Sequence, residues 1–223
     1  MTEDLKNPLA HEGREVVYSC LSHLYMDTPD GKTYEMLKVL SDGMSDMEGY
    51  SEETVQGLQG IKDFLLKREQ IPESERAEFD LNILRGYTQI FCLTKSVPTS
   101  ESYYTSVDKI VMQESRDDAL RLYKSAGFSM DIDSNEPEDY ISSELMFMSY
   151  LSMAAKKACL ASNWERLENV LEFQRKFIET HLFTWLDKFA AGIAEYSCAE
   201  RLYDFIAKLT VGYVKDDRAF LDN

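Results

Sequence analysis

The sequence predicts an all-α protein, and three features of its 223 residues support that class. Apolar residues recur at intervals of three and four in most segments, which is the pattern of amphipathic helices. No stretch alternates apolar and polar residues as a half-buried strand does. All five prolines fall between the periodic segments, where they interrupt no helix: Pro8, Pro29, Pro72, Pro98 and Pro137.

The first helix is expected over residues 11–26, where apolar residues share one face. Arg14 lies on that face, so we expect it to meet a buried acid. The turn sequence DTPDG ends the helix. Two further helices, over 33–40 and 55–68, flank a segment that is rich in glycine and acidic residues.

Longer helices follow in the rest of the chain. Gly127 suits the left-handed cap at the end of one of them. Another begins within SNEPEDYISSELMFM, where Asn135 or Glu136 can cap and Pro137 fits the first turn. The acids that follow Pro137 face the positive end of the helix dipole. These helices are expected at 74–93, 107–127, 137–160, 164–190 and 195–215.

The helices are expected to form a single globular domain of about eight to ten helices. This domain would cover residues 11–217, between a disordered or loosely attached N-terminus (1–10) and a C-terminal tail (218–223). A chain of this length buries enough surface to fold without a disulfide or a metal. No linker divides it, although residues 128–136 could hinge two helical halves.

The charge of the chain indicates which partners it prefers. Forty acidic and 24 basic residues give a formal charge of −16, which repels nucleic acid and anionic lipid and attracts basic ligands. Solubility alone is the other interpretation of this charge. The N-terminus lacks a secretory apolar run, and no 18 apolar residues occur in succession. We therefore expect a cytoplasmic protein with no nucleic-acid partner and no membrane insertion.

Patterns typical of catalysis or metal binding are scarce. The sequence has no GxxxxGK[ST], no GxGxxG and no HExxH, and its four cysteines are widely spaced. We expect no catalytic residue, no metal and no cofactor, unless tertiary folding brings distant ligands together. His181 lies on an apolar stripe, where a histidine is more often a hydrogen-bonded core residue than a catalyst.

Glu144 stands on an apolar helix face that includes Met148. An ionised carboxylate there requires a cation or several hydrogen-bond donors. Two interpretations remain open: a clamp to a residue such as Arg14 or Arg85, or an anion that lines a ligand groove. The methionines of this helix are typical of a core, but they also suit surfaces that adapt to apolar peptides.

The segment EPEDYISSELMFM resembles the E-P-x-D-H-I-x-x-E-L-x-F-M signature of the TorD-like (TorD/DmsD/NarJ) chaperones of molybdenum-containing anaerobic oxidoreductases. RGYTQIFCLTKSVPTSESYY, FQRKFIETHLFTWLDKF and ERLYDFIAKLT resemble further motifs of this family, in the same order. The resemblance implies an all-α chaperone without catalytic activity. Such a protein binds the twin-arginine signal peptide of its client in the cytoplasm and holds the apoprotein for cofactor insertion before export.

The resemblance also implies where the peptide binds. A groove would be bordered by the 87–91 helix, the 98–104 loop and the 137–148 helix. Its acids would pair with the arginines of the peptide, and its aromatic and aliphatic residues would take the apolar ones. The implied peptide-binding residues are Tyr87, Ile90, Phe91, Pro98, Glu101, Ser102, Tyr104, Pro137, Asp139, Tyr140, Glu144 and Met148.

Three positions depart from the family pattern: Tyr140 replaces a histidine, Gly86 an acid and Thr99 a proline. The identity of the client stays open, as do a transient contact with the client's molybdopterin and the choice between a monomer and a helix-exchanged dimer. Two other functions stay open. One is a helical adaptor that binds a folded protein through a flat apolar patch, and the other is an acid–base enzyme that uses Asp139 with His181 or Glu144.

Overall fold

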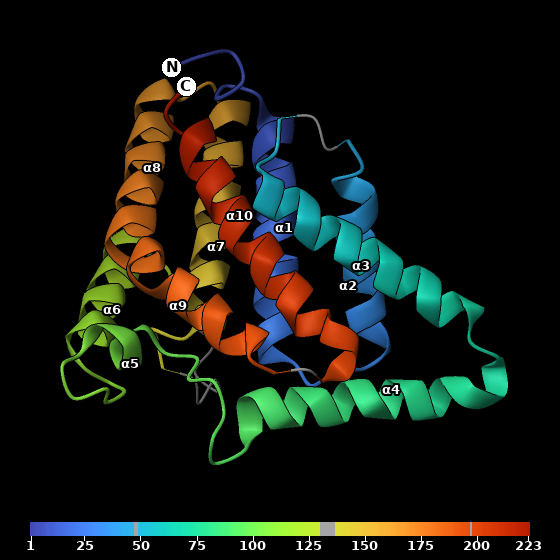
Figure 1. Cartoon of the computed structure of the whole chain (residues 1–223). Helices are drawn as coiled ribbons and strands as arrows, with labels where there is room; N and C mark the ends of the chain where they lie inside the picture. Colours follow the sequence, from blue (N-terminus) through green and yellow to red (C-terminus); the bar gives the residue numbers. More distant parts are fainter. Residues whose placement is uncertain (47–48, 130–136, 197) are drawn as a thin grey trace. The chain divides into compact units, whose positions relative to one another are not determined.

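Helices account for most of the residues that the structure describes, and the predicted all-α class is confirmed. The computed structural model describes residues 1–46, 49–129, 137–196 and 198–223 (Figure 1). These residues contain no strand, although one isolated bridge pairs Ser100 with Tyr140. The helices are α1 (Pro8–Met26), α2 (Gly31–Gly43), α3 (Glu52–Gln70), α4 (Glu73–Tyr87), α5 (Glu101–Thr105), α6 (Glu114–Ala126), α7 (Ile141–Leu160), α8 (Trp164–Phe177), α9 (Phe183–Ala194) and α10 (Leu202–Phe220), with π-helical turns at Thr88–Cys92 and Ile178–Leu182 and a 3-10 turn at Ala199–Arg201.

The chain divides into two compact units. The first unit comprises Met1–His23, Thr99–Trp185 and Asp217–Asn223, and the second comprises Leu24–Pro98 and Leu186–Asp216. Of the proposed hinge at 128–136, residues 130–136 lie outside the described residues. The single domain and the hinge therefore stay predictions.

The chain ends differ from the predicted loose N-terminus and C-terminal tail. Leu5 is buried, and its carbonyl accepts a hydrogen bond from the ring of His11. At the other end α10 continues to Phe220, and Leu221 is buried while its carbonyl accepts from Arg175 Nε at 2.8 Å. Because these apolar side chains pack and their carbonyls are hydrogen-bonded, the ordered structure extends on both sides of residues 11–217.

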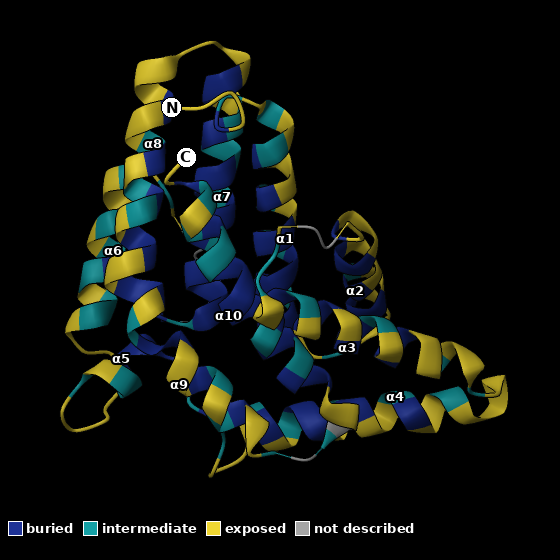
Figure 2. Ribbon diagram, turned by 45° about the horizontal axis from the view of Figure 1, so that its top comes forward, coloured by how far each residue is buried: buried dark blue, intermediate teal, exposed yellow. Residues whose placement is uncertain are grey.

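Helix α7 is the centre of the first unit, and α8 packs along it. It is buried along most of its length (Figure 2) because its residues are apolar or small on nearly every side. Phe147 of α7 packs against Tyr123 and Phe177 with ring centroids 4.4 and 4.9 Å apart. Such aromatic pairs each contribute about 0.5 to 1.5 kcal/mol beyond their buried area.

The expectation that Arg14 meets a buried acid is confirmed in the first unit. Arg14 Nε and Nη2 donate to the two carboxylate oxygens of Asp217 at 2.5 and 2.9 Å. Nη2 also donates to Gln174 Oε1 at 3.0 Å, and Tyr18 donates to Asp217 Oδ2 at 2.7 Å. Arg14 and Asp217 are only 5% and 4% exposed, so this paired charge is shielded from water.

His11 completes this network as a neutral side chain. Its Nδ1 lies 3.0 Å from Arg14 Nη1, and its Nε2 lies 2.8 Å from the carbonyl oxygen of Leu5. A guanidinium can only donate, so Nδ1 accepts and Nε2 carries the proton. Burial, together with the charge of Arg14, lowers the pKa of His11 from 6.5 to about 4.

Acid should therefore destabilise the protein through His11. Below about pH 6.5 the unfolded chain binds a proton at His11, whereas the folded chain binds it only near pH 4. The free energy of unfolding therefore falls as the pH is lowered through this window, by up to about 3 kcal/mol. Urea unfolding at a series of pH values should show the wild type losing more stability on acidification than His11→Gln, which does not titrate. Parallel curves for the two proteins would contradict the assignment.

Candidate functional site

Asp139 ties the segment before α5 to the turn before α7. Its Oδ2 accepts hydrogen bonds from Ser100 Oγ at 2.6 Å and from the Ser102 main-chain N–H at 2.9 Å. Its carbonyl accepts from the Glu101 N–H at 2.8 Å, and the Ile141 N–H donates to the carbonyl of Thr99 at 2.9 Å. The turn before α7 thereby holds residues 99–106, and we call these residues the strap.

This backbone pairing corrects the predicted start of α7. The helix begins at Ile141, so Pro137 precedes it and does not occupy its first turn. The carbonyl of Pro137 instead accepts from the Tyr140 N–H and from Ser143 Oγ at 3.2 and 3.0 Å. The proposed caps Asn135 and Glu136 lie outside the described residues. Residues 137–140 pair with the strap, and this tertiary contact decides where the helix begins.

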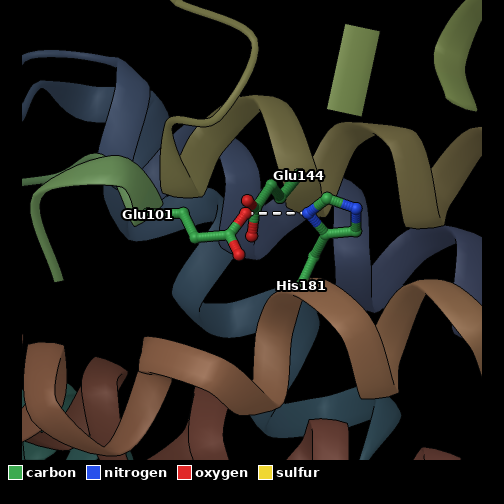
Figure 3. A group of neighbouring side chains, drawn as sticks. All are labelled: Glu101, Glu144 and His181. Carbon is green, nitrogen blue, oxygen red and sulfur yellow. Dashed lines mark hydrogen bonds and ion pairs between the residues drawn. The ribbon is translucent and has the colours of Figure 1, made fainter. Parts of the chain in front are cut away.

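Glu101, the first residue of α5, binds His181 of the π-helical turn (Figure 3) and Thr184 of α9. Its Oε2 lies 2.7 Å from His181 Nδ1, and its Oε1 accepts from Thr184 Oγ1 at 3.0 Å. His181 belongs to the π-helical turn Ile178–Leu182, and its ring stacks on Phe177 at 4.7 Å. The interpretation of His181 as a hydrogen-bonded core histidine agrees with this environment, since it is 4% exposed.

Glu144 projects from the first turn of α7 toward the same place. Its Oε2 accepts from Trp185 Nε1 at 3.1 Å, while its buried Oε1 has no hydrogen-bond partner among the described residues. Burial, and then the neighbouring Glu101, raise the pKa of Glu144 well above its usual range. The predicted clamp from Arg14 or Arg85 does not hold the carboxyl group of Glu144. Arg14 binds Asp217, and Arg85 donates to Glu78 and Asn82.

The aromatic residues of the strap lie beside this cluster. Tyr104 stacks on Trp185 with ring centroids 5.4 Å apart, and Tyr103 meets Tyr104 edge to face at 5.2 Å. Burial raises the pKa of Tyr104, so its hydroxyl stays protonated. Tyr104 and Tyr140 are both half-buried.

The other implied peptide-binding residues divide between the two units. Ser102, Pro137 and Met148 are buried in the first unit with the acids described above. In the second unit Tyr87 and Ile90 are buried, and Phe91 and Pro98 are half-buried. Phe91 packs against Tyr203 and Tyr87 with centroids 5.1 and 5.2 Å apart. A groove made from both sets of residues stays a prediction.

Sequence reasoning did not predict some of the partners of these residues. Ser100 and Thr184 carry no pattern that distinguishes them from other hydroxyl residues, and only the fold shows what they bind. Trp185 could have been found, because it follows His181 at the spacing of the H-L-x-x-W motif. Arg116 was also missed; it binds Glu138, next to Asp139, through two nitrogens at 2.6 and 3.2 Å.

No helix in the described part of the chain is long and apolar enough to cross a membrane. These features define an all-helical protein in which buried polar side chains hold a strap that carries partly exposed tyrosines. A family model described as "Nitrate reductase delta subunit" matches residues 48–191. The chain belongs to this family, which confirms the predicted TorD-like membership.

Two curated relatives match the whole chain, and a third matches part of it. A protein named "Chaperone protein TorD" from Vibrio cholerae serotype O1 (strain O395) is 27% identical over 233 residues, which cover 100% of this chain and 97% of the relative. The protein of the same name from the El Tor Inaba strain is 26% identical over 230 residues, with the same coverage. That of Psychrobacter sp. (strain PRwf-1) is 26% identical over 69% of this chain and 66% of its own.

The chain is therefore a chaperone and not an enzyme, as the sequence predicted. The alternative of an acid–base enzyme is wrong. The geometry gives it no support either, since the carboxylate hydrogen-bonded to His181 is Glu101, and Asp139 is used to hold the strap.

Proposed function

We propose that this chaperone binds the twin-arginine signal peptide of a molybdoenzyme subunit in the cytoplasm and holds the apoprotein for cofactor insertion before export. The observation that carries the proposal is the strap. The family resemblance connects the positions of Asp139 and Ser102 with peptide binding. The Ser102 main-chain N–H donates a hydrogen bond to Asp139 Oδ2 at 2.9 Å. The formal charge of −16 supports a basic ligand, because it accelerates encounter with one.

The burial of the acids suggests how the work is divided between residues. Asp139, Glu101 and Glu144 are at most 2% exposed, and each already accepts hydrogen bonds. Direct pairing with an arginine of the peptide would require its guanidinium to reach carboxyl groups that are shielded from solvent. We therefore assign Asp139 and Glu101 to holding the strap, and Glu144 to holding Trp185, on which a tyrosine of the strap stacks. We assign peptide contact to the partly exposed Tyr104 and Tyr140. A tyrosine ring can stack on a guanidinium, and its hydroxyl can donate a hydrogen bond.

Isothermal titration with synthetic twin-arginine peptides tests this assignment. Tyr140→Ala should weaken binding at least about fivefold, which corresponds to about 1 kcal/mol or more, as expected for an aromatic anchor. Trp164→Ala is the matched control, since Trp164 is an exposed aromatic residue at the start of α8. Wild-type binding should also weaken with salt and with twin-lysine peptides. If no peptide binds, the proposal fails; if salt and lysine change nothing, its electrostatic part fails.

A second candidate function, docking of a folded partner, is favoured by one surface. The loop between α5 and α6 exposes four apolar side chains: Val107 at 99%, Ile110 at 51%, Val111 at 42% and Met112 at 59%. Exposed apolar patches mark interaction sites more often than isolated apolar residues do. If this loop docks the mature part of a client, Val107→Ser with Met112→Ser should reduce client capture and leave the titration with the signal peptide unchanged.

A further inference from the structure

Three buried side chains from distant parts of the sequence converge in the first unit (Figure 3). Glu101 comes from α5, Glu144 from α7 and His181 from the π-helical turn before α9, and they are 2%, 0% and 4% exposed. One ligand atom from each residue lies within 4.8 Å of the other two. We propose that this cluster binds a divalent transition-metal ion, with Zn²⁺ as the best match.

The chemistry of the donors selects this class of ion. Two carboxylates and one imidazole form a mixed oxygen and nitrogen set, which suits Zn²⁺ and other first-row transition metals. Calcium prefers six to eight oxygen ligands, and magnesium retains several water ligands. A closed site that includes an imidazole supplies neither environment. A dication would also offset the cost of burying the negative charge of carboxylates that are shielded from water.

The hydrogen bonds around the cluster are a second, independent observation. Thr184 Oγ1 donates to the outer oxygen of Glu101 at 3.0 Å, and Trp185 Nε1 donates to the outer oxygen of Glu144 at 3.1 Å. Metal-binding carboxylates are usually held in this way by donors behind them. Glu144 Oε1 is buried and lacks a hydrogen-bond partner among the described residues, so an oxygen remains for a cation.

The same atoms show what the metal would replace. Glu101 Oε2 and His181 Nδ1 now lie 2.7 Å apart and share a hydrogen bond. Coordination of both atoms to one ion would replace that hydrogen bond with two metal–ligand bonds. The proton between the two atoms, together with any proton held by Glu144, would be released to solvent. The ion would then fasten the strap to α7 and to the π-helical turn. This inference does not rest on signal-peptide binding and survives if that proposal fails.

The first experiment measures binding to the untagged, full-length protein after removal of metals with a chelator. Zn²⁺ is titrated by calorimetry and Co²⁺ by visible absorption, which reports the ligand field directly. Because the ligands are nearly inaccessible to water, each metal is also added during refolding from urea. We expect a single ion per chain, intense visible bands from Co²⁺ and a higher melting temperature with Zn²⁺.

Variants then identify the ligands. Glu144→Gln and His181→Gln should each weaken Zn²⁺ binding by about 100-fold or more, and Thr184→Val, which removes only a supporting donor, by about tenfold. Glu172→Gln and His23→Gln are matched controls outside the cluster and should bind as the wild type does. Circular dichroism checks that every variant is folded.

Two results would overturn the proposal: no saturable binding by the wild type under either loading procedure, or unchanged binding by folded Glu144→Gln and His181→Gln. If both variants fail to fold, X-ray absorption of the wild type loaded with Zn²⁺ decides the question. Imidazole and oxygen ligands support the cluster, and sulfur ligands exclude it.

Discussion

Replacement of Arg14 by methionine should lower the free energy of unfolding by about 3 to 5 kcal/mol. Methionine preserves much of the volume of the side chain but leaves the carboxylate of Asp217, which is 4% exposed, without its cation. Tyr18 would still donate to Asp217 Oδ2, but a single neutral hydrogen bond does not compensate a buried charge. Urea unfolding at neutral pH measures the loss.

A double variant separates the loss of the ion pair from a general disturbance of packing. Removal of both charges, with Arg14→Met and Asp217→Leu together, should recover a large part of the stability lost by Arg14→Met alone. If the destabilisation of the double variant equals the sum of the destabilisations by Arg14→Met and Asp217→Leu alone, the two residues are not coupled. The assignment of a buried ion pair would then be wrong.

Gly212→Ala should destabilise the protein by about 1 to 3 kcal/mol, although alanine is the better helix former. A Cβ atom at Gly212 of α10 would lie 2.4 Å from the main-chain nitrogen of Thr54 in α3. Gly57 of α3 has the reciprocal restriction, with the main chain of Leu209 at 2.5 Å. Helices α3 and α10 lie close together at these positions in the second unit, so the backbone of one helix cannot shift without moving the other.

Gly13→Ala is the matched control for this prediction. Gly13 is an exposed residue inside α1, and a Cβ atom there would meet nothing within 4 Å. The substitution should therefore stabilise the protein by about 1 kcal/mol through helix propensity. Chemical denaturation of both variants, analysed with a common slope, provides the comparison. A stabilising effect of Gly212→Ala would show that the two helices are not in close contact.

The sequence predicted the helices well wherever local forces decide the outcome. Periodicity located most of the helical segments, and the left-handed cap at Gly127 is confirmed by its φ of 74°. In contrast, α6 begins at Glu114 and not at Val107, because Lys109 and Met112 adopt positive φ values that a helix cannot contain. Helix α5 escaped prediction because five residues are too few to show a period.

The site was less accessible to sequence reasoning, for a physical reason. The apolar face around Glu144 correctly indicated that its carboxyl group points inward. No local pattern identifies its partner Trp185, which lies 41 residues away in the sequence. The glycines of α3 are a similar case. Glycine is unfavourable inside a helix, whereas Gly57 is needed where the main chain of Leu209 approaches. Contacts between distant segments arise from tertiary packing, which periodicity does not encode.

The π-helical turn at Ile178–Leu182 has a consequence for how this chain can vary. Such a turn accommodates one residue more than an α-helix would at the same place, and each residue rotates a helix by about 100°. Deletion of one residue here would relax the turn and change the direction in which His181 and Trp185 point relative to Phe177. The length of this segment is therefore as constrained as its composition, and an insertion or deletion should be tolerated less than a substitution.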